Sequence, residues 1–147
     1  MSTWTQLISD REVKKHSTSK EEIDNLLAVV SRDIQDASLQ GLSADRRFAT
    51  AYNAALQLCK LSIACAGYRV TSNAHHQKSF EIADLALGKS AYDFTSYFEY
   101  CRRKRNVLDY DKAGVVTEDE SMELLEKVNE FENFVVDWLK NKQISLI

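Results

Sequence analysis

The sequence predicts an all-α fold, an up-and-down bundle of about five helices. The 147 residues contain no proline and four glycines, whereas sandwiches and barrels need turn residues at short intervals. Apolar residues also recur every three or four positions over long stretches, which is the period of a helix. With 44% hydrophobic and 28% charged residues, the chain has the composition and length of one globular domain.

The first two long helices are predicted by capping residues and apolar stripes. Residues 21–37 follow Ser19 and Glu22, which form a capping-box pattern, and they carry one apolar face. Residues 44–66 form the second helix, which ends where Gly67 suits a left-handed C-cap. This second helix is apolar around much of its circumference, so we expect it at the centre of the bundle.

Three further helices complete the predicted bundle. A shorter one covers residues 74–87, and the next runs from about 91 to 108. The last follows a second capping box, made of Thr117 and Glu120, and it has a clear amphipathic stripe. Because the connecting loops are short, sequential helices are expected to pack antiparallel.

The N-terminal 18 residues are mostly polar and are expected to form an arm or a short extra helix, with the bundle in residues 19–147. The N-terminus lacks the basic and apolar regions of a signal peptide, and no apolar stretch is long enough to span a membrane. The expected compartment is therefore the cytoplasm, without membrane contact.

The cysteines and the net charge narrow the expected chemistry. Cys59, Cys65 and Cys101 have no metal-ligand spacing and are interpreted as small buried thiols, so neither a metal nor a cofactor is expected. A net charge of −3 gives no overall attraction for nucleic acid. Any site for a polyanion must therefore be a local patch.

Four consecutive cations at residues 102–105 form such a patch. The structural interpretation is that cations near the end of a helix complement its dipole. A helix spreads consecutive residues around its axis, so Arg102 and Arg105 share a face while Arg103 points elsewhere.

The run Arg105-Asn106-Val107-Leu108-Asp109-Tyr110 resembles the defining motif of the HEPN superfamily. These proteins are small bundles of four or five helices, with an arginine that is usually followed by a polar residue and, further on, by a histidine. The alanine-rich stretch 44–56, and residues 66–69 followed by His75-His76, are similar to one bacterial HEPN subfamily. The resemblance covers roughly residues 42–138.

This resemblance implies a phosphate site and a partner. In HEPN ribonucleases two protomers pair, the arginines hold the scissile phosphate, and the histidines assist attack of the 2′-hydroxyl without a metal. Here Tyr110 stands at the histidine position, and a tyrosine with a pKa of about 10 is a poor general base at neutral pH. Phosphate binding remains implied, with Arg105 clamping the phosphate through two hydrogen bonds and Asn106 adding one through its amide. The resemblance implies a homodimer in a toxin–antitoxin or defence-type system, beside a nucleotidyltransferase partner. In some of these pairs the partner modifies a tyrosine of the motif region, and Tyr110 is a candidate only by that analogy.

Each remaining candidate has a structural and a functional interpretation. Arg46 and Arg47 belong to a solvated first turn, with Arg47 reaching over the core edge, in the structural interpretation. In the functional one, Arg46, Tyr52 or Asn53 lies on the wall of the same groove as Arg105. Tyr68 and Arg69 form either a loop anchor or a base-stacking and phosphate pair.

Histidines and aromatic residues also leave two interpretations open. His75 and His76 belong to an exposed helix start or replace the missing histidine, and His16 is expected to be exposed. The aromatic run within residues 92–100 is interpreted as core or dimer interface more readily than as a nucleic-acid surface.

The sequence thus supports three competing functions. The first is a module that binds a nucleotide or RNA phosphate; its candidate residues are Arg46, Tyr68, Arg69, Arg102, Arg105 and Asn106. The second is a metal-independent endoribonuclease with Arg105, Asn106 and Tyr110 as catalytic residues. The third is a helical adaptor whose apolar faces bind a protein.

Overall fold

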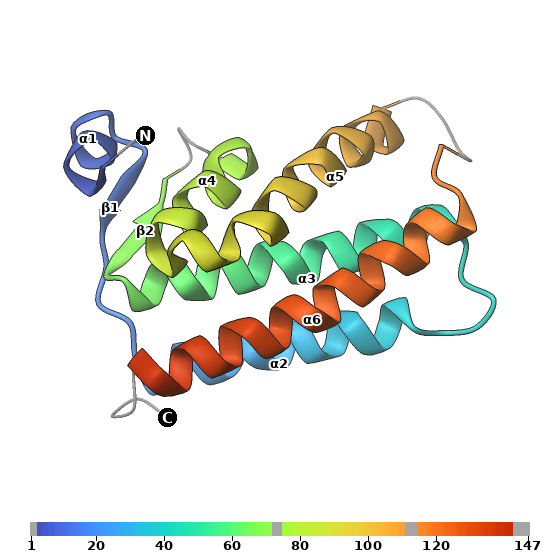
Figure 1. Cartoon of the computed structure of the whole chain (residues 1–147), viewed down its shortest axis with the longest axis horizontal. Helices are drawn as coiled ribbons and strands as arrows, with labels where there is room; N and C mark the ends of the chain where they lie inside the picture. The colour runs from blue at the N-terminus through green and yellow to red at the C-terminus, as the bar shows by residue number, and fades with distance from the viewer. Residues whose placement is uncertain (1–2, 72–74, 111–114, 143–147) are drawn as a thin grey trace.

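The chain folds as an all-α helical bundle, as predicted, in which the long helices α2, α3 and α6 run side by side (Figure 1). The computed structural model describes residues 3–71, 75–110 and 115–142, with side chains placed there except at 75–77, 105–110 and 142. In chain order the elements are α1 (Trp4–Ser9), β1 (Val13–Lys15), α2 (Lys20–Ala37), α3 (Ala44–Cys65), β2 (Tyr68–Val70), α4 (His75–Leu87), a 3-10 turn η1 (Lys89–Ala91), α5 (Tyr92–Tyr110) and α6 (Glu118–Lys142).

Side-chain caps fix where the predicted helices begin. At the start of α2 only half of the predicted capping box forms: the Ser19 hydroxyl accepts a hydrogen bond from the backbone N–H of Glu22 at 3.1 Å, whereas the Glu22 carboxylate bonds His16 and Thr18. At the start of α6 the predicted capping box is complete, because Thr117 and Glu120 each accept the other's backbone N–H, at 3.1 and 3.0 Å. Gly67 follows α3 with φ +96°, a conformation that glycine adopts without strain, and this lets the chain turn into β2.

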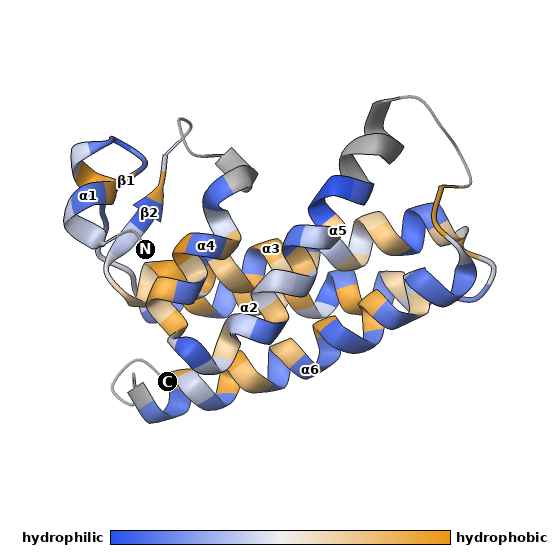
Figure 2. Ribbon diagram, turned by 45° about the horizontal axis from the view of Figure 1, so that its top comes forward, coloured by the Kyte–Doolittle hydropathy of each residue, from blue (hydrophilic) through white to orange (hydrophobic). Residues whose placement is uncertain are grey.

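α3 occupies the centre of the bundle, as its apolar circumference predicts. It contacts α2 and α6 as well as α4, α5 and β2. Ala51, Ala54 and Ala55 are fully buried along α3, and such small side chains let neighbouring helices approach closely. Figure 2 shows apolar positions gathered in the interior and hydrophilic positions on the outer faces of the helices.

The aromatic run on α5 divides between core and surface. Phe98 is fully buried, and its ring centroid lies 5.1 Å from that of Phe131 on α6, while Phe94 lies 5.2 Å from Phe131. This confirms the core interpretation for both phenylalanines. Tyr92 and Tyr100 are instead exposed, at 62% and 52% of their surface.

The N-terminal arm, described from residue 3, contains a strand that the sequence did not indicate. β1 pairs antiparallel with β2, with Val13 opposite Val70. Strands of three residues are too short to show a period-two pattern, so neither was predicted. Leu7 and Val13 are each 2% exposed and belong to the core of the bundle, so the arm packs as part of it.

Within the described ranges no helix combines the length and the apolar character needed to cross a membrane.

Candidate functional site

The basic segment of α5 is partly neutralised by neighbouring carboxylates. Arg102 donates to Glu99 Oε1 through Nε at 2.9 Å and through Nη2 at 2.7 Å, one turn earlier on the same helix. Lys104 forms an ion pair with Glu120 on the first turn of α6. Arg103 is exposed. Of the three cations whose side chains are described, two therefore have acidic partners on the protein.

The residues that carry the HEPN resemblance lie at the far end of the same helix. The backbone of α5 remains helical to Tyr110, so positions 102, 105 and 106 fall within about one helical turn on one side of its axis. The side chains of Arg105, Asn106 and Tyr110 are outside the described residues, as are those of His75 and His76. Their predicted contacts stay predictions.

Arg47 is a structural residue, although we expected its head group to reach over the core edge into solvent. Its side chain is 7% exposed. It donates to the carbonyl of Ala37, the last residue of α2, at 2.9 Å, to the carbonyl of Leu39 at 3.2 Å and to Glu118 Oε1 at 2.6 Å. These bonds join the end of α2, the start of α3 and the start of α6. Arg46, the preceding residue, is exposed.

The other candidates on α3, Tyr52 and Asn53, make contacts with neighbouring helices of the bundle. Tyr52 is 1% exposed, and its ring packs edge-on against Phe80 of α4 with centroids 5.8 Å apart. Asn53 donates through Nδ2 to Asp33 Oδ2 on α2 at 2.6 Å. Asp33 also accepts from Arg32 and is 5% exposed.

Tyr68 anchors neighbouring elements to each other, whereas Arg69 is a cation on the surface. The Tyr68 ring stacks on Trp4 with centroids 4.1 Å apart and planes 5° apart, which ties α1 to β2. Arg69 is exposed and stands opposite Lys14 in the β1–β2 register. The anchor interpretation thus fits Tyr68, and Arg69 remains available to a ligand.

A pocket of about 300 Å³ lies where the start of α2, the middle of α3, β2 and α4 meet. Sequence reasoning missed two of its polar residues, Gln57 and Lys60, which lie on one face of α3 with Asn53. That polar stripe on an otherwise apolar central helix was the signal that could have revealed the pocket. Arg69 lines the same pocket from β2.

His16 lines this pocket too and is half-buried, whereas we expected it to be exposed. Its Nε2 lies 2.8 Å from Glu22 Oε1, to which the Thr18 hydroxyl also donates at 2.6 Å. The hydrogen bonds from Thr18 and then from His16 lower the pKa of Glu22. Through these two hydrogen bonds Glu22, on the first turn of α2, holds the segment that precedes the helix in place.

A second, more apolar hollow of about 780 Å³ lies beside α1, α4 and the 3-10 turn, with Leu7, Leu85 and Tyr92 in its lining. Asp84 lines it as well, and partial burial raises the pKa of this carboxyl, while the Thr95 hydroxyl donates to it at 2.8 Å. A half-buried carboxyl beside apolar side chains gives this hollow no attraction for an anion.

The cysteines match their interpretation as thiols inside the bundle. Cys59 and Cys101 are buried and Cys65 is half-buried, with no disulfide among them. Burial raises the pKa of Cys101 to about 12 and that of Cys59 further, which makes both poor nucleophiles at neutral pH. Among the described side chains, no group of three His, Cys, Asp or Glu is arranged to hold a metal ion.

Comparison of the chain with protein-family models, with curated proteins and with solved structures finds no match.

Proposed function

We propose that the chain is a HEPN-like protein that binds the phosphate of a nucleotide or of RNA through the basic segment of α5, residues 102–106. The observation that carries this proposal is the position of that segment. Figure 1 shows the C-terminal end of α5 standing away from α3 and α6, and Figure 2 shows hydrophilic positions where its described side chains end. The last buried side chain described on α5 is Cys101, immediately before the cations.

The ion pairs of the segment leave it available to a phosphate. Arg102 and Glu99 are 18% and 32% exposed and lie three residues apart on one helix, and such pairs stabilise a protein by less than about 1 kcal/mol. A phosphate offers Arg102 a bidentate, negatively charged acceptor in exchange. Arg103 is exposed, and Arg105 and Asn106 supply the remaining donors in this proposal.

The proposed protein acts as a homodimer and together with a partner enzyme. Two copies would bring two α5 segments to one nucleic acid, as in the HEPN ribonucleases. Tyr100 is 52% exposed one residue before Cys101, and an exposed aromatic ring beside a basic segment suits either a base or a second copy. A nucleotidyltransferase partner and a cytoplasmic toxin–antitoxin or defence role follow from the same resemblance.

Binding of a mixed pool of fluorescent single-stranded RNA, followed by anisotropy, tests the proposal. We expect Arg105→Ala to weaken binding at least about tenfold, the equivalent of about 1.4 kcal/mol. The slope of the logarithm of the binding constant against the logarithm of the salt concentration should also become less steep by about 0.7 for each phosphate contact that is lost. Lys127→Ala is the matched control, because it removes one charge from α6 at a side chain 45% exposed. Equal affinities for wild type, Arg105→Ala and Lys127→Ala would contradict the proposal.

The same RNA pool, incubated with EDTA and analysed for fragments, asks whether binding leads to cleavage. Cleavage that persists in EDTA and disappears in Arg105→Ala would make the chain a metal-independent endoribonuclease, with Tyr110 as no obstacle to catalysis. Cleavage that Arg105→Ala leaves unchanged would indicate a contaminating nuclease. Binding without cleavage agrees with a tyrosine at the position of the proton-transfer residue.

A further inference from the structure

The pocket between α2, α3, β2 and α4 is separate from the basic segment of α5 and has polar residues of its own. We propose that it binds a phosphate monoester with a flat apolar body, the chemistry of a mononucleotide. Lys60 and Arg69 hold the phosphate at the rim, and Gln57 hydrogen-bonds the edge of the base inside. All three residues line the pocket, from α3 and from β2.

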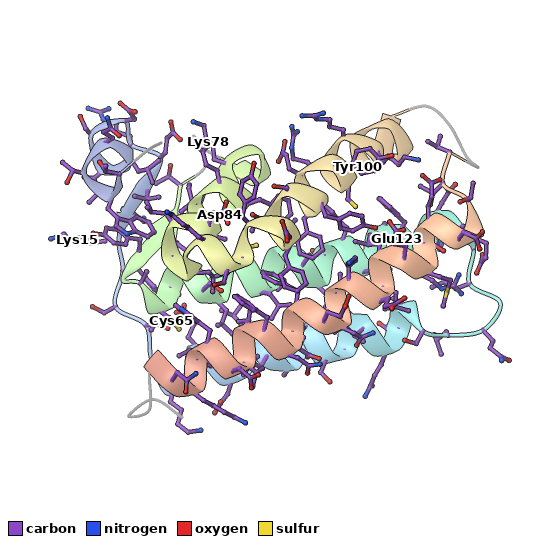
Figure 3. All side chains as sticks on the ribbon, viewed as in Figure 1. Lys15, Cys65, Lys78, Asp84, Tyr100 and Glu123 are labelled. Atoms are coloured by element: carbon purple, nitrogen blue, oxygen red, sulfur yellow. The ribbon has the colours of Figure 1, made fainter. Side chains whose placement is uncertain are left out.

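The first argument is the charge of the two cations in the lining, Lys60 and Arg69. Arg69 stands directly opposite Lys14 in the β1–β2 register, and like charges in that position destabilise a strand pair. Lys14 and Lys15 of β1 do not line the pocket themselves, and Figure 3 shows the Lys15 side chain pointing away from the bundle. Among the described residues, no acidic side chain forms an ion pair with Lys60, Arg69 or either of these two lysines. A bound anion would offset this repulsion.

The second argument is the interior of the pocket. Leu26, Leu56 and Ile63 give it apolar walls, and its volume of about 300 Å³ matches the lower end of small-molecule sites. Gln57 is half-buried, and its amide has no hydrogen bond to another described residue. A partly buried amide gains from a partner, and the edge of a nucleobase supplies both a donor and an acceptor.

Glu22 limits where the phosphate can lie. Its carboxylate is in the same pocket and repels an anion, but Thr18 and His16 both bond it at the α2 side. Because Lys60 also helps to lower the pKa of Glu22, the phosphate competes with that carboxylate for Lys60 and has Arg69 as its second cation. This places the base towards Asn53 and Gln57 along α3.

A titration of the 15N-labelled full chain with AMP, with adenosine and with inorganic phosphate, followed by amide chemical shifts, tests the site. We expect saturable shifts at millimolar AMP that are centred on Lys60 and on residues 68–71, and weaker binding of the two fragments. No saturable shift, or AMP binding no tighter than inorganic phosphate, would overturn the assignment to a mononucleotide.

Variants then locate the contacts. Lys60→Met and Arg69→Gln change exposed side chains, so both proteins should keep the wild-type spectrum, and each should weaken AMP at least about tenfold. Gln57→Leu should weaken AMP while leaving inorganic phosphate unchanged. Lys127→Met is the matched control and should bind AMP as wild type does. Unchanged affinity in both Lys60→Met and Arg69→Gln would show that AMP binds elsewhere.

This inference is independent of the function proposed for α5. Arg105→Ala should leave the AMP titration unchanged, and Lys60→Met should leave the effect of Arg105 on RNA binding unchanged. If AMP binding is lost in Arg105→Ala and kept in Lys60→Met, the nucleotide belongs to α5 and the pocket proposal is wrong.

Discussion

Arg47 near the start of α3 and Arg102 on α5 each stand beside a second arginine in the sequence, yet their surroundings differ. Arg47 is 7% exposed and bonds two backbone carbonyls and Glu118, whereas Arg102 is 18% exposed and bonds one carboxylate on its own helix. The carbonyls that accept from Arg47 belong to the end of α2 and the turn after it, so these hydrogen bonds hold that part of the chain against α3. The partner of Arg102 can be exchanged for a ligand without loosening any contact between helices.

The first turn of α6 joins these two regions. Glu118 binds Arg47 of α3, and Glu120 binds Lys104 of α5, two residues apart on one helix. The two acidic residues also lie at the positive end of the α6 dipole, which favours their negative charge. Two cations therefore reach the same helix start, Arg47 from the core and Lys104 from α5, whereas Arg102 is paired within α5 by Glu99.

The largest effect is expected for Arg47→Ala. The change leaves the carbonyls of Ala37 and Leu39 without their donor and should lower the free energy of unfolding by about 3 kcal/mol, as for other broken buried charged hydrogen bonds. Urea denaturation measures the loss. Arg46→Ala is the neighbouring control, since Arg46 is exposed, and it should change stability by less than about 0.5 kcal/mol. Equal losses in the two variants would remove the distinction between buried and exposed arginines.

Thr117→Ala is expected to have a middle-sized effect. It removes the hydroxyl that caps α6 and should cost about 1 kcal/mol, because the backbone N–H of Glu120 loses its acceptor. Thr117→Ser keeps that acceptor and should restore most of the loss in the same urea experiment. If the alanine variant is as stable as wild type, the start of α6 is not held by its cap, and the two ion pairs must hold it.

A smaller stability effect, but a larger binding effect, is expected for Arg102→Ala. Loss of its pair with Glu99 should cost less than about 1 kcal/mol, whereas affinity for single-stranded RNA should fall. Glu99→Gln should do the opposite and strengthen RNA binding, because Arg102 loses its competing carboxylate. Glu126→Gln, an exposed change of the same charge on α6, controls for net charge. Equal gains from the two glutamine variants would show that only the overall charge matters.

The fold could be predicted well from sequence because its signals are local. Capping residues such as Ser19 and Thr117 act within one turn, and the apolar stripes repeat within each helix. β1 and β2 could not be found this way, since three residues carry no period and their partners are far apart in the chain. The aromatic run on α5 was correctly assigned to the core at Phe94 and Phe98, where helical spacing decides which side is buried.

The candidate sites were predicted less completely because their contacts are distant in sequence. Arg47 finds its acceptors 8, 10 and 71 positions away, so nothing near it distinguishes it from Arg46. The pocket likewise gathers His16, Lys60 and Arg69 from three separate elements. Residue types indicated that cations were present, but only packing decides which of them are satisfied by the protein.

The smallest expected effect is the pH dependence of the pair between Glu120 and Lys104. The hydrogen bond from Lys104, and then that from the backbone of Thr117, lower the pKa of Glu120 in the folded chain. A carboxyl whose pKa is lower in the folded state adds stability above its unfolded pKa of about 4.3, and this stability is lost as the pH falls through the folded value. Since Glu120 is 34% exposed, we expect its contribution to be at most about 0.5 kcal/mol.

Urea midpoints of wild type and Glu120→Gln between pH 7 and pH 3 measure that contribution. The glutamine variant should be slightly less stable at pH 7, and the two curves should converge as the pH falls, because protonation removes the charge that the variant already lacks. Lys104→Met should reduce the gap at pH 7, since it removes the main cause of the lowered pKa. A gap that stays constant with pH would mean that Glu120 acts through its capping hydrogen bond and not through its charge, and Lys104 would then be as available to a phosphate as Arg103.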